Sequence, residues 1–172
     1  MKKIFLISAI FFSAFTINAQ KFAMVDMDYI LKNIPSYESA NDQLSQLSAR
    51  WQKEVEAKLI EIQTMYKNYN TELVFLSTEM QNKRVEEIRA AENEANALKR
   101  KYFGPEGELF KRREALVKPI QDEIYNAVQE YCNTKGYQLI LDKKSSSGII
   151  FASPKIDISD EVLTQMGYSV AK

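Results

Sequence analysis

The chain has 172 residues, of which 45% are hydrophobic and 27% charged, and its 23 basic side chains balance 23 acidic ones. This composition is typical of about one folded domain and excludes a disordered chain and a chain embedded in a membrane along its length. Without a basic excess, a general nucleic-acid-binding protein is also disfavoured. Five glycines and four prolines are few for this length, which favours long uninterrupted helices.

Residues 1–19 have the organisation of a signal peptide. Lys2 and Lys3 precede an apolar run, and Ala19 offers a small residue for cleavage. The run of about 14 residues is shorter than the roughly 20 that a membrane-spanning helix needs, which disfavours a retained membrane anchor. We therefore expect export across the inner membrane with cleavage after Ala19. The mature chain then carries a net charge of about −2.

No catalytic pattern is present in the sequence. Histidine, the commonest general base and metal ligand, is absent, and so are a phosphate-binding loop and a G-x-S-x-G motif. The glutamates of residues 86–94 interleave with basic residues, as on solvated helix faces. We therefore predict no enzymatic activity, no cofactor and no metal. Cys132 is the only cysteine; it is either a small buried residue or the site of a disulfide between subunits.

The mature chain begins with a predicted strand. KFAMVDM, residues 21–27, alternates between two faces, which is typical of a short strand. Residues 28–34 predict one or two helical turns that end before Pro35, because the residue preceding a proline disfavours helical backbone angles. Ser36 is then a suitable N-cap for the next helix.

A long helix is predicted from Tyr37 onward. Its apolar positions follow one another at steps of three or four, with a mean of about 3.5 residues, which is the coiled-coil spacing. At 1.5 Å per residue this helix is about 60 Å long. Thr78 with Gln81 resembles a capping box, so we expect the tip of a helical hairpin near residues 76–78. The apolar seam consists of Tyr37, Ala40, Leu44, Leu47, Trp51, Val55, Leu59, Ile62, Tyr66, Tyr69, Leu73 and Leu76.

The return helix has a thinner seam and an interruption. Alanines replace large residues, which lowers the apolar area buried per turn. Gly104 and Pro105 then break the helix, either as a hinge or as a bulge that aligns helices of unequal length. A strong apolar stripe follows, with Pro119 as a candidate kink and Gly136 as the stop. The two stripes are Val85, Ile88, Ala91, Ala95, Leu98 and Tyr102, and Leu109, Leu116, Ile120, Ile124, Ala127 and Tyr131.

The C-terminal part predicts two strands and a short helix. YQLILDKKSSSGIIF, residues 137–151, suggests a hairpin that pairs with the first strand, because a lone hairpin is marginally stable. Ser159 is expected to cap the last helix and Gly167 to end it. Three short strands make a poor core, which favours oligomerisation.

The predicted fold class is mainly α with a small β body (α+β). We expect a β body formed by residues 20–36 and 136–172. A long antiparallel helical-hairpin arm, residues 37–135, is expected to stand on the small sheet.

Both ends of the mature chain resemble the Skp (OmpH-like) family of periplasmic chaperones. The matching stretches are KFAMVDMDYIL at residues 21–31, KGYQLILD at 135–142 and GIIFASPKIDISDEVL at 148–163. Between them, length and helical pattern match. The resemblance implies a jellyfish-like trimer in which a β body joins three subunits and three arms enclose a cavity. The body residues expected to hold the trimer are Phe22, Met24, Val25, Leu139, Leu141, Ile149 and Ile150.

The resemblance also implies a holdase. Unfolded outer-membrane β-barrel proteins would be held in the cavity in the periplasm, and their aggregation prevented without nucleotide. Many weak apolar contacts suit such binding and release. The candidate client-binding residues are large side chains off the seam or near the tip: Ile60, Met65, Val74, Phe75 and Met80. For each of them, packing inside the hairpin is the alternative.

The sequence leaves alternatives for the role of the basic runs and for the function of the protein. The near-neutral charge disfavours contact with a membrane surface or lipopolysaccharide, and the basic runs 99–101 and 111–113 are either a local patch or a solvated face. The alternative function is that of a secreted coiled-coil structural or adaptor protein of the cell envelope, which would bind a folded partner through its arm.

Overall fold

A computed structural model describes residues 21–145 and 148–169. Contacts divide the chain into two compact units. The arm unit is Ile34–Glu123; the body unit consists of the residues up to Asn33 and those from Ile124 onward. The expected boundaries of the arm, 37–135, stay a prediction. The expected signal peptide, residues 1–19, lies outside the described residues.

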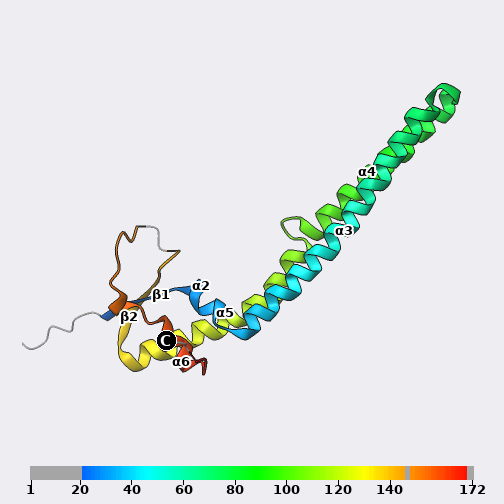
Figure 1. Cartoon of the computed structure of the whole chain (residues 1–172). Coiled ribbons are helices and arrows are strands. Elements are labelled where there is room, and N and C mark those ends of the chain that lie inside the picture. Colours follow the sequence, from blue (N-terminus) through cyan, green and yellow to red (C-terminus); the bar gives the residue numbers. More distant parts are fainter. Residues whose placement is uncertain (1–20, 146–147, 170–172) are drawn as a thin grey trace, which may run out of the picture. The chain divides into compact units, whose positions relative to one another are not determined.

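The body unit contains a two-stranded parallel sheet (Figure 1). Strand β1 (Lys21–Val25) pairs with β2 (Tyr137–Asp142), so that Phe22 lies opposite Leu139 and Met24 opposite Leu141. Parallel strands need a crossover connection, and here residues 26–136 provide it. The expected pairing of the first strand with YQLILD is therefore confirmed.

The prediction of a second strand in residues 148–151 is wrong, and so is the prediction of a three-stranded sheet. Ile150 is 101% exposed and lies outside any strand. The Asp142 carboxylate accepts a hydrogen bond from the Ser145 amide at 3.1 Å, which turns the chain at the end of β2. The other edge of β1 is instead reached by Asp157, which forms a parallel bridge with Met24.

Two short helices complete the body unit. Helix α2 (Met27–Lys32) is capped by Asp26, whose carboxylate accepts from the Tyr29 amide at 3.0 Å. Helix α6 (Ser159–Gln165) begins at Ser159, so the expected N-cap role of Ser159 is wrong. The hydroxyl of Ser159 accepts from the Asp26 amide at 2.8 Å and donates to the Asp157 carboxylate, which ties the starts of the two helices together. The largest fully buried side chains described in this unit are Ile30, Ile124, Val162 and Leu163.

The arm unit contains a long helical hairpin. Helix α3 (Pro35–Glu72) and helix α4 (Thr78–Phe103) run side by side, joined by the 3-10 turn η2 (Leu73–Phe75) (Figure 1). The 38 residues of α3 span about 57 Å. This confirms the predicted mainly α fold with a long helical hairpin and a small sheet.

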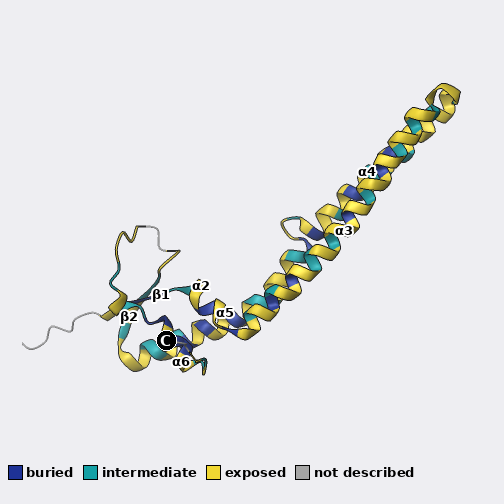
Figure 2. Ribbon diagram, in the orientation of Figure 1, coloured by how far each residue is buried: buried dark blue, intermediate teal, exposed yellow. Residues whose placement is uncertain are grey.

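Only part of the predicted seam is buried (Figure 2). Leu59, Tyr66 and Leu73 are 51%, 44% and 36% exposed. The buried seam residues of the hairpin are Ala40, Leu44, Val55, Ile62, Ile88, Ala95 and Tyr102.

Two expected caps of the hairpin are misplaced by one or two residues. Helix α3 begins at Pro35, so Ser36 lies inside its first turn. Proline suits the first helical position, because its missing N–H has no intrahelical partner there. Helix α4 is capped by Ser77, and Thr78 is its first residue.

The expected break follows Phe103. Two glycines form it because the backbone passes too close for a side chain: a Cβ at Gly104 would lie 2.4 Å from the Arg100 carbonyl oxygen, and one at Gly107 2.8 Å from that of Tyr102. Helix α5 (Glu108–Lys135) then runs through Pro119. The helix stops before Gly136, whose φ is 75°.

Of the helices described, none is both long and apolar enough to cross a membrane.

Candidate binding surfaces

The candidate functional sites are apolar surfaces. Within the described ranges, no group of three or more acidic, cysteine or histidine side chains could hold a metal ion. Large hydrophobic side chains are exposed in both units instead; exposed positions are yellow in Figure 2. Contiguous exposed apolar surface is typical of contact with other chains.

The first surface is the tip of the hairpin. Val74 and Phe75 in η2 are 82% and 86% exposed, and Met80 in the first turn of α4 is 53% exposed. Packing inside the hairpin is therefore wrong for these three predicted residues. The side-chain amide of Gln81 donates to the carbonyl oxygens of Leu73 and Leu76, both at 3.2 Å, and so closes the tip from within.

The remaining two predicted client-binding residues lie apart from the tip. Ile60 is 56% exposed and Met65 is half-buried. Ile60 precedes the last residue of α3 by about 18 Å along the helix axis. The structure therefore brings Val74, Phe75 and Met80 together, but it does not bring Ile60 to them.

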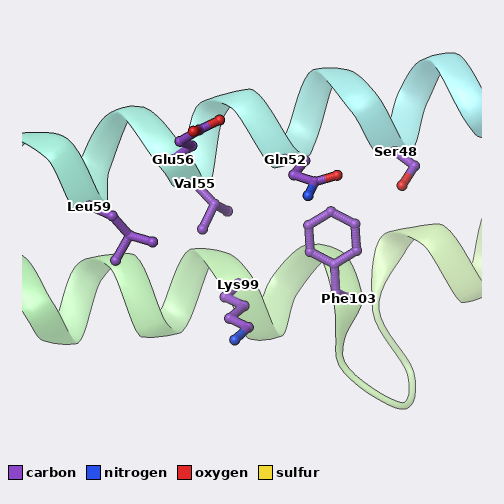
Figure 3. Close-up of a pocket in the computed structure, with 7 residues that line it drawn as sticks. All are labelled: Ser48, Gln52, Val55, Glu56, Leu59, Lys99 and Phe103. Carbon is purple, nitrogen blue, oxygen red and sulfur yellow. The ribbon is translucent and has the colours of Figure 1, made fainter.

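The second surface is a groove between α3 and α4 that the sequence reasoning missed. It has a volume of about 570 Å³. Val55, Leu59 and Phe103 point into the gap between the helices, and the Phe103 ring faces Gln52 (Figure 3). The sequence signal was Phe103, a large apolar residue beside the predicted break. The lining residues are Ser48, Gln52, Val55, Glu56, Leu59, Lys99 and Phe103.

Beside this groove, three residues connect α3 to the end of α4: Trp51, Glu54 and Tyr102. The ring of Trp51 stacks on that of Tyr102, and the Tyr102 hydroxyl donates to the Glu54 carboxylate at 2.9 Å. The hydrogen bond to Glu54 and burial together raise the pKa of Tyr102. The last turn of α4 is thus fixed against α3.

The third surface is on the body sheet. Phe22 and Leu139, paired across the two strands, are 56% and 54% exposed. Ile149 and Ile150 are also exposed. Of the other residues predicted to hold a trimer, Met24 and Val25 are buried within the protomer and Leu141 is half-buried.

Polar groups fix the turn that follows β2. Burial by itself raises the pKa of Asp142, but hydrogen bonds from the Ser145 side chain and from the amides of Met27, Lys144 and Ser145 outweigh it and lower the pKa. The Lys144 ammonium group lies 2.7 Å from the Asp28 carboxylate, and this hydrogen bond raises the pKa of Lys144.

The two basic runs are exposed, and Cys132 is half-buried. Residues 99–101 and 111–113, which flank the break, expose all their cationic side chains. Lys111 pairs with Glu108 at 3.7 Å. Cys132 is half-buried, and burial raises the pKa of its thiol.

The fold and these surfaces define a helical-hairpin protein with a small sheet and exposed apolar tip. A family model described as outer membrane protein (OmpH-like) matches residues 21–166. The chain therefore belongs to the OmpH-like family, which confirms the resemblance seen in the sequence.

A solved structure supports the fold. A proposed OmpH-like outer membrane chaperone from Caulobacter crescentus matches with a TM-score of 0.65 at 11% sequence identity, over 84% of this chain and 82% of that one. A search of curated proteins finds no match.

Proposed function

We propose that the chain is an ATP-independent periplasmic holdase chaperone that binds unfolded outer-membrane β-barrel proteins and prevents their aggregation. The observation that carries the proposal is the exposed apolar tip, with Val74 and Phe75 more than four-fifths exposed, on a hairpin of an OmpH-like protein. Exposed side chains of this size in a monomeric protein would be an aggregation hazard. In a chaperone they are the binding surface.

The client chemistry follows from the nature of the surface. An unfolded barrel strand alternates apolar and polar side chains, and its apolar half needs cover from water. Val74, Phe75 and Met80 offer that cover without charge. Methionine adapts to varied partners because its side chain is flexible and polarizable. Separate small contacts along the arm, including Ile60 and Met65, allow release without a nucleotide.

The active species in this proposal is a homotrimer. Phe22, Leu139, Ile149 and Ile150 expose apolar surface on the body, and contact between copies would remove it from water. Met24, Val25 and Leu141 then support the interface from inside the protomer. A small sheet with two strands needs such additional burial.

The proposal is tested with the chain Gln20–Lys172 and an outer-membrane barrel protein that is unfolded in urea and then diluted. Light scattering during size-exclusion chromatography gives the mass of the protein alone and with the client. We expect three subunits alone and a complex with the client that stays in solution. A protein that binds a folded envelope partner and leaves several unrelated unfolded barrels to aggregate would be an adaptor instead.

A further inference from the structure

We propose that the groove between α3 and α4 binds an extended segment of the client whose apolar side chains stand at alternate positions. The occupant is thus a strand-forming stretch of unfolded polypeptide. This inference rests on the proposed chaperone function and assigns the site in the arm that selects for the alternating pattern. The groove is distinct from the hairpin tip, since none of the tip residues lines it.

The floor of the groove is apolar and open. Leu59 is 51% exposed and Phe103 37% exposed, whereas Val55 between them is buried at 8%. All three point into the gap (Figure 3). A side chain entering from outside would therefore contact aliphatic and aromatic carbon on both helices. A volume of about 570 Å³ has room for more than one side chain, since small-molecule pockets begin at about 300 Å³.

The groove is held in shape before anything binds. The Trp51–Tyr102 stack and the hydrogen bond from Tyr102 to Glu54 fix the last turn of α4. The next residue, Phe103, is therefore held at the end of the groove. Gly104 then lets the chain leave the helix at once, with its amide bonded to the Arg100 carbonyl at 2.9 Å. A site formed in advance costs less ordering free energy on binding.

The rim selects a neutral polypeptide over a charged ligand. Glu56 lies over α3 and Lys99 over α4, on opposite walls (Figure 3). An anion such as a lipid headgroup is attracted by Lys99 but repelled by Glu56, and the reverse holds for a cation, so neither kind of ion is bound favourably by both groups. A peptide backbone offers both C=O acceptors and N–H donors along its length. These match the ammonium and carboxylate groups, and the side chains of Ser48 and Gln52 add uncharged partners.

The spacing of the groove matches an extended chain. Val55 and Leu59 are four residues apart on α3, which is about 6 Å along the helix axis. Alternate side chains of a strand are about 6.6 Å apart. Successive apolar side chains on one face of a strand can therefore meet successive turns of α3. A helical segment repeats apolar side chains at a similar distance, but its backbone N–H and C=O groups are bonded within the helix, whereas those of an extended chain are free to bond the polar side chains of the rim.

The test compares two labelled peptides of identical composition. Both have twelve uncharged residues; in one, phenylalanine alternates with serine, and in the other pairs of phenylalanines alternate with pairs of serines, so that no two phenylalanines stand two residues apart. Fluorescence anisotropy during titration with the chain Gln20–Lys172 gives the two dissociation constants. We expect the alternating peptide to bind at least about fivefold more tightly, because only its apolar side chains fit successive turns. Equal affinities would overturn the inference.

Matched variants assign the binding to the groove. Phe103→Ala should weaken binding of the alternating peptide about tenfold, since it removes most of the aromatic floor. Phe110→Ala, at an exposed phenylalanine of α5 outside the groove, should leave it unchanged. Leu59→Asn serves as a second groove variant, because an exposed position on α3 tolerates it without loss of the helix. Equal effects of Phe103→Ala and Phe110→Ala would refute the site.

The proposed function is read out separately by retention of a whole unfolded barrel protein in solution. Retention without discrimination between the peptides would remove the groove assignment and leave the chaperone function standing. Discrimination between the peptides without retention of the barrel would remove the function and leave the groove as a peptide-binding site.

Discussion

The indole ring of Trp51 stacks on the phenol ring of Tyr102 with 4.8 Å between ring centroids and 6° between ring planes. The pair joins the middle of α3 to the last turn of α4. We expect Trp51→Ala to lower the free energy of unfolding by about 2 kcal/mol, because apolar burial and aromatic contact are both lost. Trp51→Phe should cost less than half of this. Urea unfolding followed by circular dichroism measures both; equal losses would mean that the stack contributes nothing specific.

The break after Phe103 depends on a close backbone approach at Gly104. Gly104→Ala places a Cβ 2.4 Å from the Arg100 carbonyl oxygen, and the backbone cannot give way as a flexible side chain would. We expect a loss of about 1–3 kcal/mol in the free energy of unfolding. Glu106→Ala, in the same loop and exposed, is the control and should change it by less than about 0.5 kcal/mol. Similar losses in both variants would contradict the close approach.

The body unit should lose stability in acid through Asp142. Its pKa is lower in the folded chain than in the unfolded one, so the ionised carboxylate stabilises the fold above about pH 4. This stabilisation disappears as the pH falls through the folded-state pKa. Asp142→Asn should therefore show a shallower fall of unfolding free energy between pH 6 and pH 3 than the parent. The control Asp42→Asn, at an exposed position of α3, should follow the parent; a parent-like slope for Asp142→Asn would exclude this role.

Assembly should depend on the exposed face of the sheet. Leu139→Asp introduces a charge beside Phe22, in the surface proposed to contact other copies, and burying that charge is costly. We predict dissociation of the trimer with unchanged helix content. The neighbouring change Gln138→Asp adds the same charge on the opposite face of β2, since side chains alternate along a strand, and should leave the trimer intact. A light-scattering mass of three subunits for Leu139→Asp would remove this face from the interface.

Client binding should depend on the tip. The double change Val74→Ser, Phe75→Ser removes the two most exposed apolar side chains of η2 and leaves the buried seam untouched. We predict the same melting temperature and at least about a tenfold weaker hold on unfolded barrel protein, since two large apolar contacts are lost. The control is Phe110→Ser, outside the tip. Retention of client equal to the parent would show that the tip is not a binding surface.

Much of the fold could be predicted from the sequence, because it depends on residue types and their spacing along the chain. The seam spacing from Tyr37 predicts a hairpin because it repeats over many turns, and each turn adds independent support. Gly104 with Pro105 marks the break, and Gly136 and Gly167 mark helix ends, because these residue types have few alternatives. Exposure of Val74 and Phe75 follows from their place off the seam.

N-caps were predicted wrongly where more than one nearby residue could serve as the cap. Ser77 and Thr78 are both good caps, and the one chosen depends on where η2 leaves the backbone. Ser159 has the side chain of a cap, yet it serves the amide of Asp26 across the body unit. A distant partner of this kind leaves no trace in local sequence.

The sequence by itself determined the helices, their breaks and the absence of a catalytic pattern, because helix periodicity and residue chemistry are local properties. Only the tertiary structure decided what reaches the second edge of β1: Asp157 bridges to Met24 there, and this contact joins residues that are far apart in the sequence. The groove beside Phe103 was likewise decided by packing, since its lining comes from two helices whose residues are far apart in the sequence.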